Sequence, residues 1–166
     1  RPDVVNHSWG TPTSTSTAGT SQQAIDNDQR VWDGQCFVRS AGNGGTATMG
    51  RQSTAKNAFS VGNAKSHEVD NTTGGTPGDN TAGDLHVTSS RGLTSDGRLG
   101  VEIAAPGAYN VSADGNNMPS GYIVNLGTSM AAPHVTGILG TLNQAYPAMS
   151  NNPKLQRAWV KATALK

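Results

Sequence analysis

The sequence predicts an α/β fold of three layers, in which a largely parallel sheet carries helices on both faces. An apolar pair at residues 4–5, a helical pattern over residues 21–35 and an apolar run at residues 36–40 follow one another. This order of strand, helix and strand implies a right-handed crossover between parallel strands. Nearer the other end, an apolar run at residues 122–126 leads into apolar residues that recur at helical spacing between positions 131 and 142.

The first half of the chain contains the predicted parallel strands and their loops. The strand that begins at residues 4–5 ends in a glycine turn at residues 8–10, and a Ser/Thr-rich loop over residues 11–20 precedes the predicted helix. Residues 57–64 predict a further apolar strand, with a glycine where backbones can pack closely. Residues 65–83 are almost wholly polar, and we expect them to form a loop.

The second half predicts two more strands and two helices. The strands are expected at residues 87–92 and 101–107, joined by a turn at residues 95–97. Pro133 lies near the start of the first helix, where we expect the first turn not to need its missing N–H. A Tyr-Pro pair ends this helix, and residues 153–165 predict a short amphipathic helix capped by a preceding asparagine.

The composition is that of one loop-rich, weakly charged globular domain. Of 166 residues, 34% are hydrophobic and 14% charged, and 12 basic against 11 acidic side chains give a formal charge of +1. This balance offers no electrostatic basis for binding nucleic acid or an anionic membrane. No apolar run has the length of a membrane span, and because the first three residues do not open a signal peptide, we expect any export signal upstream. The single cysteine, Cys36, excludes an intrachain disulfide and is expected to be a small buried side chain.

One serine lies where the second apolar run meets the long helix. Residues 127–137 read Gly-Thr-Ser-Met-Ala-Ala-Pro-His-Val-Thr-Gly, which places Ser129 at a helix N-terminus. Unpaired N–H groups and the positive end of the helix dipole stabilise an alkoxide or an oxyanion there, as a nucleophilic serine requires. A serine that only caps the helix is the structural alternative.

A glycine-rich turn follows the second predicted strand. Residues 40–45 read Ser-Ala-Gly-Asn-Gly-Gly, so Asn43 offers an N–H donor at the carboxyl end of a strand, where open α/β sheets place their sites. The glycines allow the backbone to approach a ligand closely. Taken alone, Asn-Gly signals no more than a turn.

Residues 127–137 resemble the nucleophile motif of the subtilisin-like serine proteases, the subtilases. The resemblance implies that Ser129 attacks the peptide carbonyl. It also implies that Asn43, in a segment similar to the Ala-Gly-Asn-x-Gly of that family, is a side-chain oxyanion donor. The elbow of α/β-hydrolases fits less well because Ala131 stands where its last glycine should be. The related sedolisins resemble one another in carrying aspartate at the oxyanion position, so Asn43 favours the subtilisin type.

The same resemblance implies a substrate-binding strand. Subtilases carry a Ser-x-Gly segment whose backbone pairs with the substrate as an added strand, and here Ser8, Trp9 and Gly10 take these positions. Ala41 and Gly42 are also expected to bind substrate. For Trp9, a core aromatic is the alternative interpretation.

The resemblance extends over residues 4–162 but covers only the later part of the subtilase catalytic domain. The Asp-Thr-Gly or Asp-Ser-Gly segment and the His-Gly-Thr-His segment that supply the orienting acid and the base do not occur. We therefore expect residues 1–166 to be a C-terminal portion of that domain, without its N-terminal part and inactive alone. His134 should point away from Ser129, and we expect none of the other histidines, at positions 7, 67 and 86, to be the base.

The function implied is that of a secreted or extracellular serine endopeptidase acting on polypeptides. Its expected partner is the N-terminal segment that carries the Asp and His. The alternatives are a non-catalytic peptide-binding module and one half of a split protease. The chemistry requires no cofactor. A structural calcium ion is an expectation, because Asp70, Asp79 and Asp84 supply carboxylates, although without a regular loop spacing.

Overall fold

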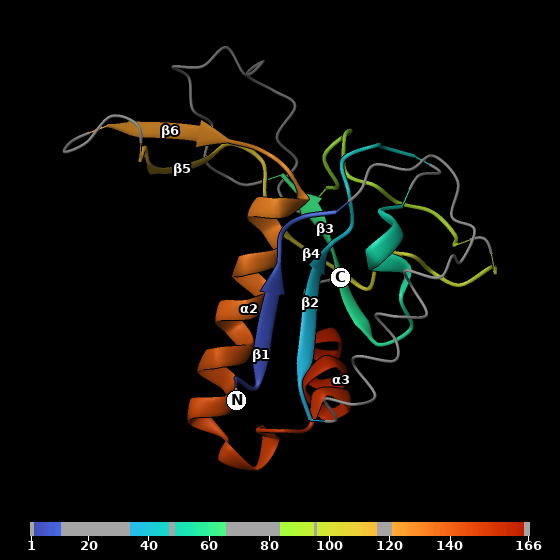
Figure 1. The fold of residues 1–166 in the computed structure, drawn as a ribbon, viewed down its shortest axis with the longest axis vertical. Helices are drawn as coiled ribbons and strands as arrows, with labels where there is room; N and C mark the ends of the chain where they lie inside the picture. Colours follow the sequence, from blue (N-terminus) through green and yellow to red (C-terminus); the bar gives the residue numbers. More distant parts are fainter. Residues whose placement is uncertain are drawn as a thin grey trace.

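The computed structural model describes residues 2–10, 34–46, 49–65, 84–94, 96–115 and 121–164. Within them, four strands form one sheet in the order β1-β2-β3-β4, and every neighbouring pair is parallel (Figure 1). The strands span Val4–His7, Cys36–Ser40, Ala58–Ala64 and Ile103–Pro106. The predicted α/β fold with a largely parallel sheet is confirmed.

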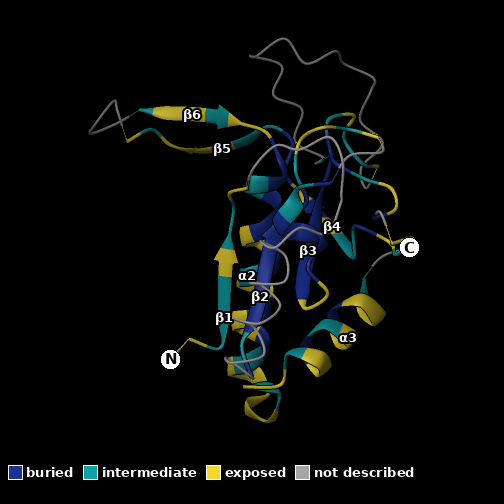
Figure 2. Cartoon of the chain, turned by 45° about the vertical axis from the view of Figure 1, so that its right-hand side comes forward, coloured by how far each residue is buried: buried dark blue, intermediate teal, exposed yellow. Residues whose placement is uncertain are grey.

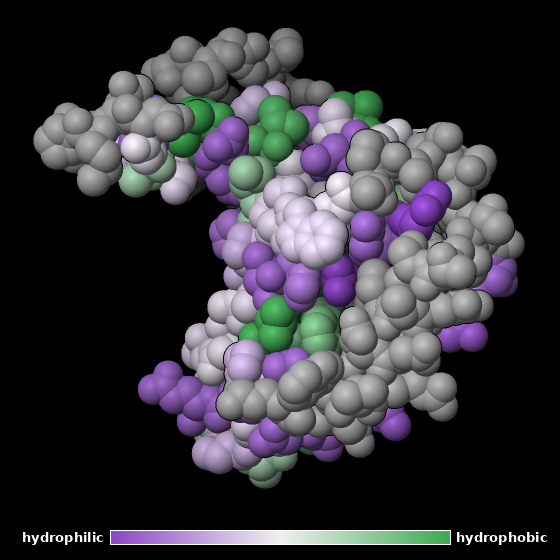
Figure 3. Space-filling model, in the orientation of Figure 1, coloured by the Kyte–Doolittle hydropathy of each residue, from purple (hydrophilic) through white to green (hydrophobic). Residues whose placement is uncertain are grey.

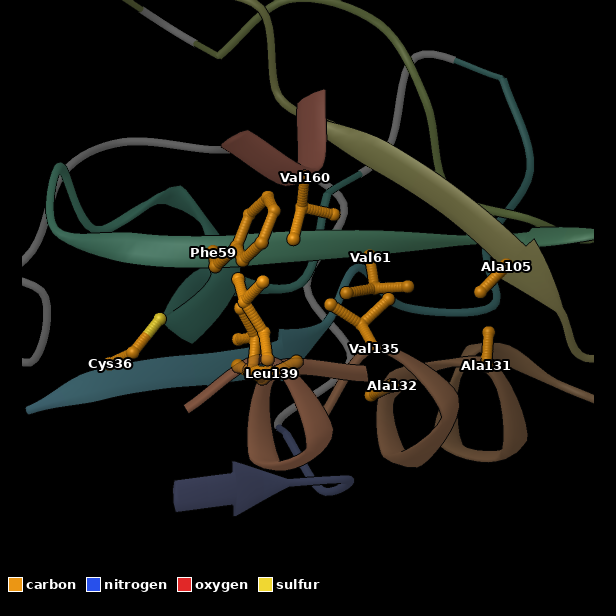
Figure 4. Close-up of a cluster of buried hydrophobic side chains, with 11 residues drawn as sticks. Cys36, Phe59, Val61, Ala105, Ala131, Ala132, Val135, Leu139 and Val160 are labelled. Atoms are coloured by element: carbon orange, nitrogen blue, oxygen red, sulfur yellow. The ribbon is translucent and has the colours of Figure 1, made fainter. Parts of the chain in front are cut away.

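The core lies between one face of this sheet and two helices, α2 (Thr128–Ala145) and α3 (Pro153–Thr163). It contains strand residues two positions apart, which therefore lie on one face, and apolar residues of the helices. Its members are Cys36, Val38, Phe59, Val61, Ala105, Ala131, Ala132, Val135, Leu139, Leu142 and Val160 (Figure 4). Figure 2 shows the central strands buried and the outer sides of the helices exposed.

The central strands β2 and β3 are buried along almost their whole length, as expected for parallel strands with neighbours on both sides. Cys36 begins β2 and is 1% exposed, so the prediction of a small buried side chain is confirmed. Burial raises the pKa of the Cys36 thiol to about 12. The thiolate form is therefore scarce at neutral pH, and Cys36 is poorly suited to act as a nucleophile.

The apolar run before α2 does not join the main sheet. Its strand β6 (Tyr122–Asn125) pairs antiparallel with β5 (Asn110–Ala113), and this hairpin projects from the body (Figures 1 and 3). Tyr122 is 78% exposed. In Figure 3 the surface is hollowed below the hairpin, on the side of β1 and α2.

The strand expected at residues 87–92 is absent from the described structure of that segment, and this prediction is wrong. Backbone N–H groups of Asn63 and Gly44 donate to the hydroxyls of Ser89 and Ser90, at 2.9 and 3.0 Å. Such side-chain bonds offer the backbone an alternative to a strand ladder. Only an isolated bridge between Thr46 and Arg91 remains.

The expectation for Pro133 is also wrong. Helix α2 begins at Thr128, so Pro133 lies beyond the first turn, where its N–H would have bonded to the Ser129 carbonyl. The end of α2 at Ala145, before Pro147, agrees with the prediction, as does α3, whose first turn is capped by Asn152 through a 3.1 Å bond from the Leu155 N–H.

Several predicted segments lie outside the described residues: the loop at 11–20, nearly all of the helix at 21–35, and the polar loop from position 66 to position 83. Short 3₁₀ helices occupy Arg51–Thr54 and Pro147–Met149. Of the helices that the structure describes, none has both the length and the hydropathy of a membrane span.

Candidate active site

Three backbone segments meet at the N-terminus of α2. Residues 8–10 follow β1, residues 41–45 follow β2, and Gly127 precedes α2. Because β1 and β2 are parallel neighbours, their carboxyl ends lie at the same edge of the sheet. The structure thus brings Ser8, Asn43 and Ser129 together from positions far apart in the sequence.

Asn43 is held by the residue that precedes the serine. Its amide oxygen accepts a 2.9 Å hydrogen bond from the Thr128 N–H and a 3.0 Å bond from the Thr128 hydroxyl. Since a backbone N–H can only donate, the atom that faces it must be the amide oxygen, which fixes the orientation of the amide. The Thr128 hydroxyl in turn accepts a 3.1 Å bond from the Gly42 N–H. The amide nitrogen of Asn43 is therefore left on the side away from Thr128.

Gly127 is required by the close approach of Asn43. It has φ 145°, a conformation that side-chain-bearing residues rarely adopt, and a Cβ at this position would lie 3.2 Å from the Asn43 amide nitrogen. A side chain here would strain the start of α2 and displace the amide together.

Two N–H donors at this place have no partner within the described part of the chain: the Asn43 amide nitrogen and the Ser129 backbone N–H. Ser129 is in the first turn of α2, where the helix dipole adds positive potential. Free N–H groups of this kind can donate hydrogen bonds to a negatively charged oxygen.

The Ser129 hydroxyl donates a 2.8 Å hydrogen bond to the backbone carbonyl of Ser8. A carbonyl oxygen holds the hydroxyl in place but is too weakly basic to take its proton. In return, the Ser8 hydroxyl donates a 2.8 Å bond to the Ser129 carbonyl. The two serines are thus joined by a pair of reciprocal hydrogen bonds.

Of the predicted substrate-binding residues, Trp9 is 62% exposed, so the alternative of a core aromatic is wrong. Its ring lies 5.8 Å from that of His7. The backbone groups of Trp9 and Gly10 make no hydrogen bond with other described residues. A Cβ on Gly10 would lie 3.1 Å from Gln52 Oε1, which places this glutamine beside the segment.

Ala41 and Gly42 have different surroundings from residues 8–10. Ala41 is fully buried, and its N–H and carbonyl bond to Val61 and Gly50 at 2.9 and 2.7 Å. The Gly42 carbonyl accepts a 2.9 Å bond from the Ser90 N–H. The backbone polar groups of both residues are thus used within the protein, where they support the loop that carries Asn43.

None of the three described histidines bonds to Ser129. His134 Nδ1 lies 2.9 Å from the Met130 carbonyl, one turn back on its own helix, and His86 Nδ1 lies 2.9 Å from Thr88 Oγ1. His7 packs against the rings of Trp9 and Phe37. Burial and, to a smaller extent, the Arg39 charge lower the pKa of His7. His67 lies outside the described residues.

A metal site is not assembled by the residues in view: among those described, no three His, Cys, Asp or Glu side chains are grouped so that they could hold an ion. Asp84 is exposed, while Asp70 and Asp79 lie outside the described ranges. Calcium binding by the polar loop therefore stays a prediction.

Two contributors to this site, the Thr128 side chain and the Ser8 hydroxyl, were not predicted from the sequence. Thr128 is 1% exposed and bonds to both Asn43 and Gly42. Its place next to Ser129 is the signal that could have identified it.

The model of the subtilase family matches residues 1–166. Among curated proteins, the C5a peptidase of Streptococcus pyogenes is 43% identical over 74 residues, which is 42% of this chain and 6% of the relative. Alkaline elastase YaB of Bacillus sp. (strain YaB) is 28% identical over 148 residues, which is 89% of this chain and 32% of the relative. The chain therefore spans a third or less of these relatives.

Two solved structures resemble the whole described fold. The S41 psychrophilic protease has a TM-score of 0.69 at 26% identity, covering 97% of this chain and 48% of that one. Sphericase has a TM-score of 0.67 at 27% identity, covering 93% of this chain and 47% of that one. The chain is thus about half as long as either structure.

Proposed function

The chain belongs to the subtilase family, and from this premise we propose that residues 1–166 are part of the catalytic domain of a serine endopeptidase. They correspond to a C-terminal portion of that domain. The observation that carries the proposal is the pair of unused N–H donors, on Asn43 and on Ser129, beside the Ser129 hydroxyl.

In this proposal Ser129 is the nucleophile. Its Oγ attacks the carbonyl carbon of a peptide bond, and the negative charge that develops on the carbonyl oxygen is stabilised by the Asn43 amide N–H and the Ser129 N–H. Thr128 fixes the Asn43 amide before substrate arrives, so the donors need little reorganisation during the reaction.

The substrate lies extended along residues 8–10. The backbone groups of Trp9 and Gly10, which bond to no other described residue, supply donors and acceptors for an added strand. Across the substrate from residues 8–10 lies the loop that carries Asn43. Ala41 and Gly42 support this loop, and its exposed side contacts the substrate.

The general base and its orienting acid come, in this proposal, from an Asp- and His-bearing segment outside residues 1–166. The contacts of the described histidines support this, because His86 and His134 bond to other groups and His7 packs against the Phe37 ring without bonding to Ser129. The incoming base must replace the Ser8 carbonyl as the acceptor of the Ser129 proton. Residues 1–166 alone are therefore inactive.

We further propose where the enzyme acts and which ions or cofactors it needs. It is secreted, its chemistry requires no cofactor, and calcium, where it binds, has a structural role in the polar loop. Membership of the subtilase family supports these points.

A fluorophosphonate probe, which reacts only with an activated serine, tests the function. We expect it to label the full-length gene product and to fail with Ser129→Ala and with residues 1–166 alone. Labelling of the isolated residues would contradict an external base. A full-length product that binds peptides but is neither labelled nor able to cleave casein would instead indicate a non-catalytic binding module. Activity restored only by a separately encoded chain would indicate a split protease.

A further inference from the structure

We propose that Ser8 is a positioning residue for the nucleophile, because its hydroxyl supplies the hydrogen bond that Pro133 denies to the Ser129 carbonyl. The catalytic consequence rests on the function proposed above. The hydrogen bond itself is a separate claim that can be tested without activity.

The need for this bond arises inside α2. In an α-helix the carbonyl of residue i accepts the N–H of residue i+4, and for Ser129 that residue is Pro133. Proline has no N–H, and its ring crowds the carbonyl four residues back. The carbonyl of the nucleophile is thus left without a helical donor.

Ser8 fills this gap from another element. Its hydroxyl lies 2.8 Å from the Ser129 carbonyl oxygen, across 121 positions of sequence. The orientation of the hydroxyl is set by Asn6, whose amide nitrogen donates to Ser8 Oγ at 3.0 Å. The Asn6 amide oxygen in turn lies 3.4 Å from the hydroxyl of Thr136 on α2. A chain of polar contacts therefore leaves α2, passes through β1 and returns to α2 at Ser129.

These polar contacts bear on catalysis because Ser8 bonds to Ser129 at two points. The Ser8 carbonyl accepts the Ser129 hydroxyl, and the Ser8 hydroxyl holds the Ser129 backbone. Ser129 directly follows Thr128, whose N–H donates a hydrogen bond to the Asn43 amide oxygen. Release of the Ser129 carbonyl would let this turn shift relative to the Asn43 amide, and a misplacement of about 1 Å can lower a rate about 100-fold.

Pro133→Ala provides a specific rescue. In the single variant Ser8→Ala, the Ser129 carbonyl has no donor. In Ser8→Ala/Pro133→Ala, the new N–H at position 133 can make the missing helical bond. In the full-length enzyme we expect Ser8→Ala to lower kcat about 10-fold with little change in KM, and the double variant to recover most of this loss. Pro133→Ala alone, in which the new N–H and the Ser8 hydroxyl both face the Ser129 carbonyl, is the reference against which the recovery in the double variant is measured.

Ser112→Ala on the projecting hairpin is the matched control. Ser112 is exposed and bonds to none of Asn6, Ser8, Ser129 and Thr136, so its replacement should leave kcat unchanged. Should Ser8→Ala fold poorly, Asn6→Ala keeps the Ser8 hydroxyl but removes the amide that orients it, together with the contact to Thr136. We expect the same rescue by Pro133→Ala with a smaller loss.

A second readout follows the carbonyl directly. Residues 1–166 contain a single Ser-Met pair, Ser129-Met130, so labelling serine carbonyls with ¹³C and methionine amides with ¹⁵N isolates its signal. In the full-length protein, the peak lost in Ser129→Ala identifies this pair. We expect its ¹³C resonance to move upfield in Ser8→Ala and to return in the double variant.

The outcomes separate the two claims. If neither kcat nor the ¹³C resonance recovers in the double variant, Ser8 does not act through the Ser129 carbonyl and the proposal is overturned. Recovery of the resonance without kcat would leave a structural bond and overturn the positioning role. A wild-type enzyme without peptidase activity would refute the proposed function, and the positioning role with it, while the resonance still decides the bond.

Discussion

The groups on the two sides of the α2 N-terminus differ in how far they are already arranged for the proposed reaction. On the side of β2, the Asn43 amide is held by two bonds from Thr128 and presents its N–H. On the side of β1, the Ser129 hydroxyl is held by the Ser8 carbonyl, an acceptor that cannot take its proton. In the proposed function, the donors for an oxyanion therefore come from residues within this chain, whereas activation of Ser129 requires a further group.

The contrast has a physical cause. Fixed dipoles act without any change in protonation, so a loop and a helix start are enough to arrange them. A general base must exchange a proton near neutral pH, which needs a titratable group within hydrogen-bond reach. Among the described residues, the Ser129 hydroxyl bonds to the Ser8 carbonyl and to no titratable side chain.

The largest effect that would test the β2 side is expected from Asn43→Asp in the full-length enzyme. The carboxylate retains the oxygen that accepts from Thr128 but loses the N–H donor. We expect kcat to fall about 100- to 1,000-fold, the loss measured for an oxyanion donor in a subtilisin.

Stability distinguishes the two possible causes of that loss. Because the contacts with Thr128 are retained, the midpoint of thermal unfolding should change little in Asn43→Asp. Equal losses of kcat and of thermal stability would instead mean that Asn43 only holds the loop together.

A smaller effect on the same side is expected from Thr128→Val. This change removes the hydroxyl that joins Gly42 to Asn43 and leaves the backbone bond to Asn43 in place. We expect kcat to fall about 10-fold, because the amide is less well oriented. Thr128→Ser retains the hydroxyl and should remain close to wild type in a steady-state assay. An equal loss in both variants would contradict a role for the hydroxyl.

On the β1 side, Trp9→Ala should affect binding and not folding. Trp9 is 62% exposed, so the free energy of unfolding should change by less than about 0.5 kcal/mol. With a peptide substrate that spans residues 8–10, we expect KM to rise about fivefold at constant kcat. Trp159→Ala on α3 is the control, and an equal rise in KM there would argue against a local contact.

The smallest effect is a pH dependence confined to the β1 side. Burial and Arg39 lower the pKa of His7, so the folded chain disfavours the protonated ring. Between the unfolded value of about 6.5 and the lower folded value, the unfolded chain binds more protons, so stability falls as pH falls through this window. Urea unfolding at pH 8 and pH 5.5 should show this loss, and His7→Gln should reduce it. An unchanged slope in His7→Gln would exclude His7 as its source.

The elements that could be predicted are those whose residues interact locally. The helical spacing after Ser129, the glycine-rich turn at Asn43 and the Asn-Pro start of α3 are short-range patterns, and all three occur in the structure. The β5–β6 hairpin was not predicted, because apolar residues at 122–126 do not reveal which partner they will pair with. The strand prediction for residues 87–92 was wrong for the same reason. The hydroxyls of Ser89 and Ser90 bond to backbone N–H groups that are distant in the sequence.

The subtilase resemblance and the positions of Ser129 and Asn43 could be predicted from short motifs, and the parallel sheet from the order of strand, helix and strand. The contacts of those residues could not: Thr128 bonds to the Asn43 amide, and Ser8 bonds to the carbonyl that Pro133 leaves without a donor. A hydrogen bond is directional and short, so a partner 121 positions away is chosen by the packing of β1 against α2 and not by any local pattern.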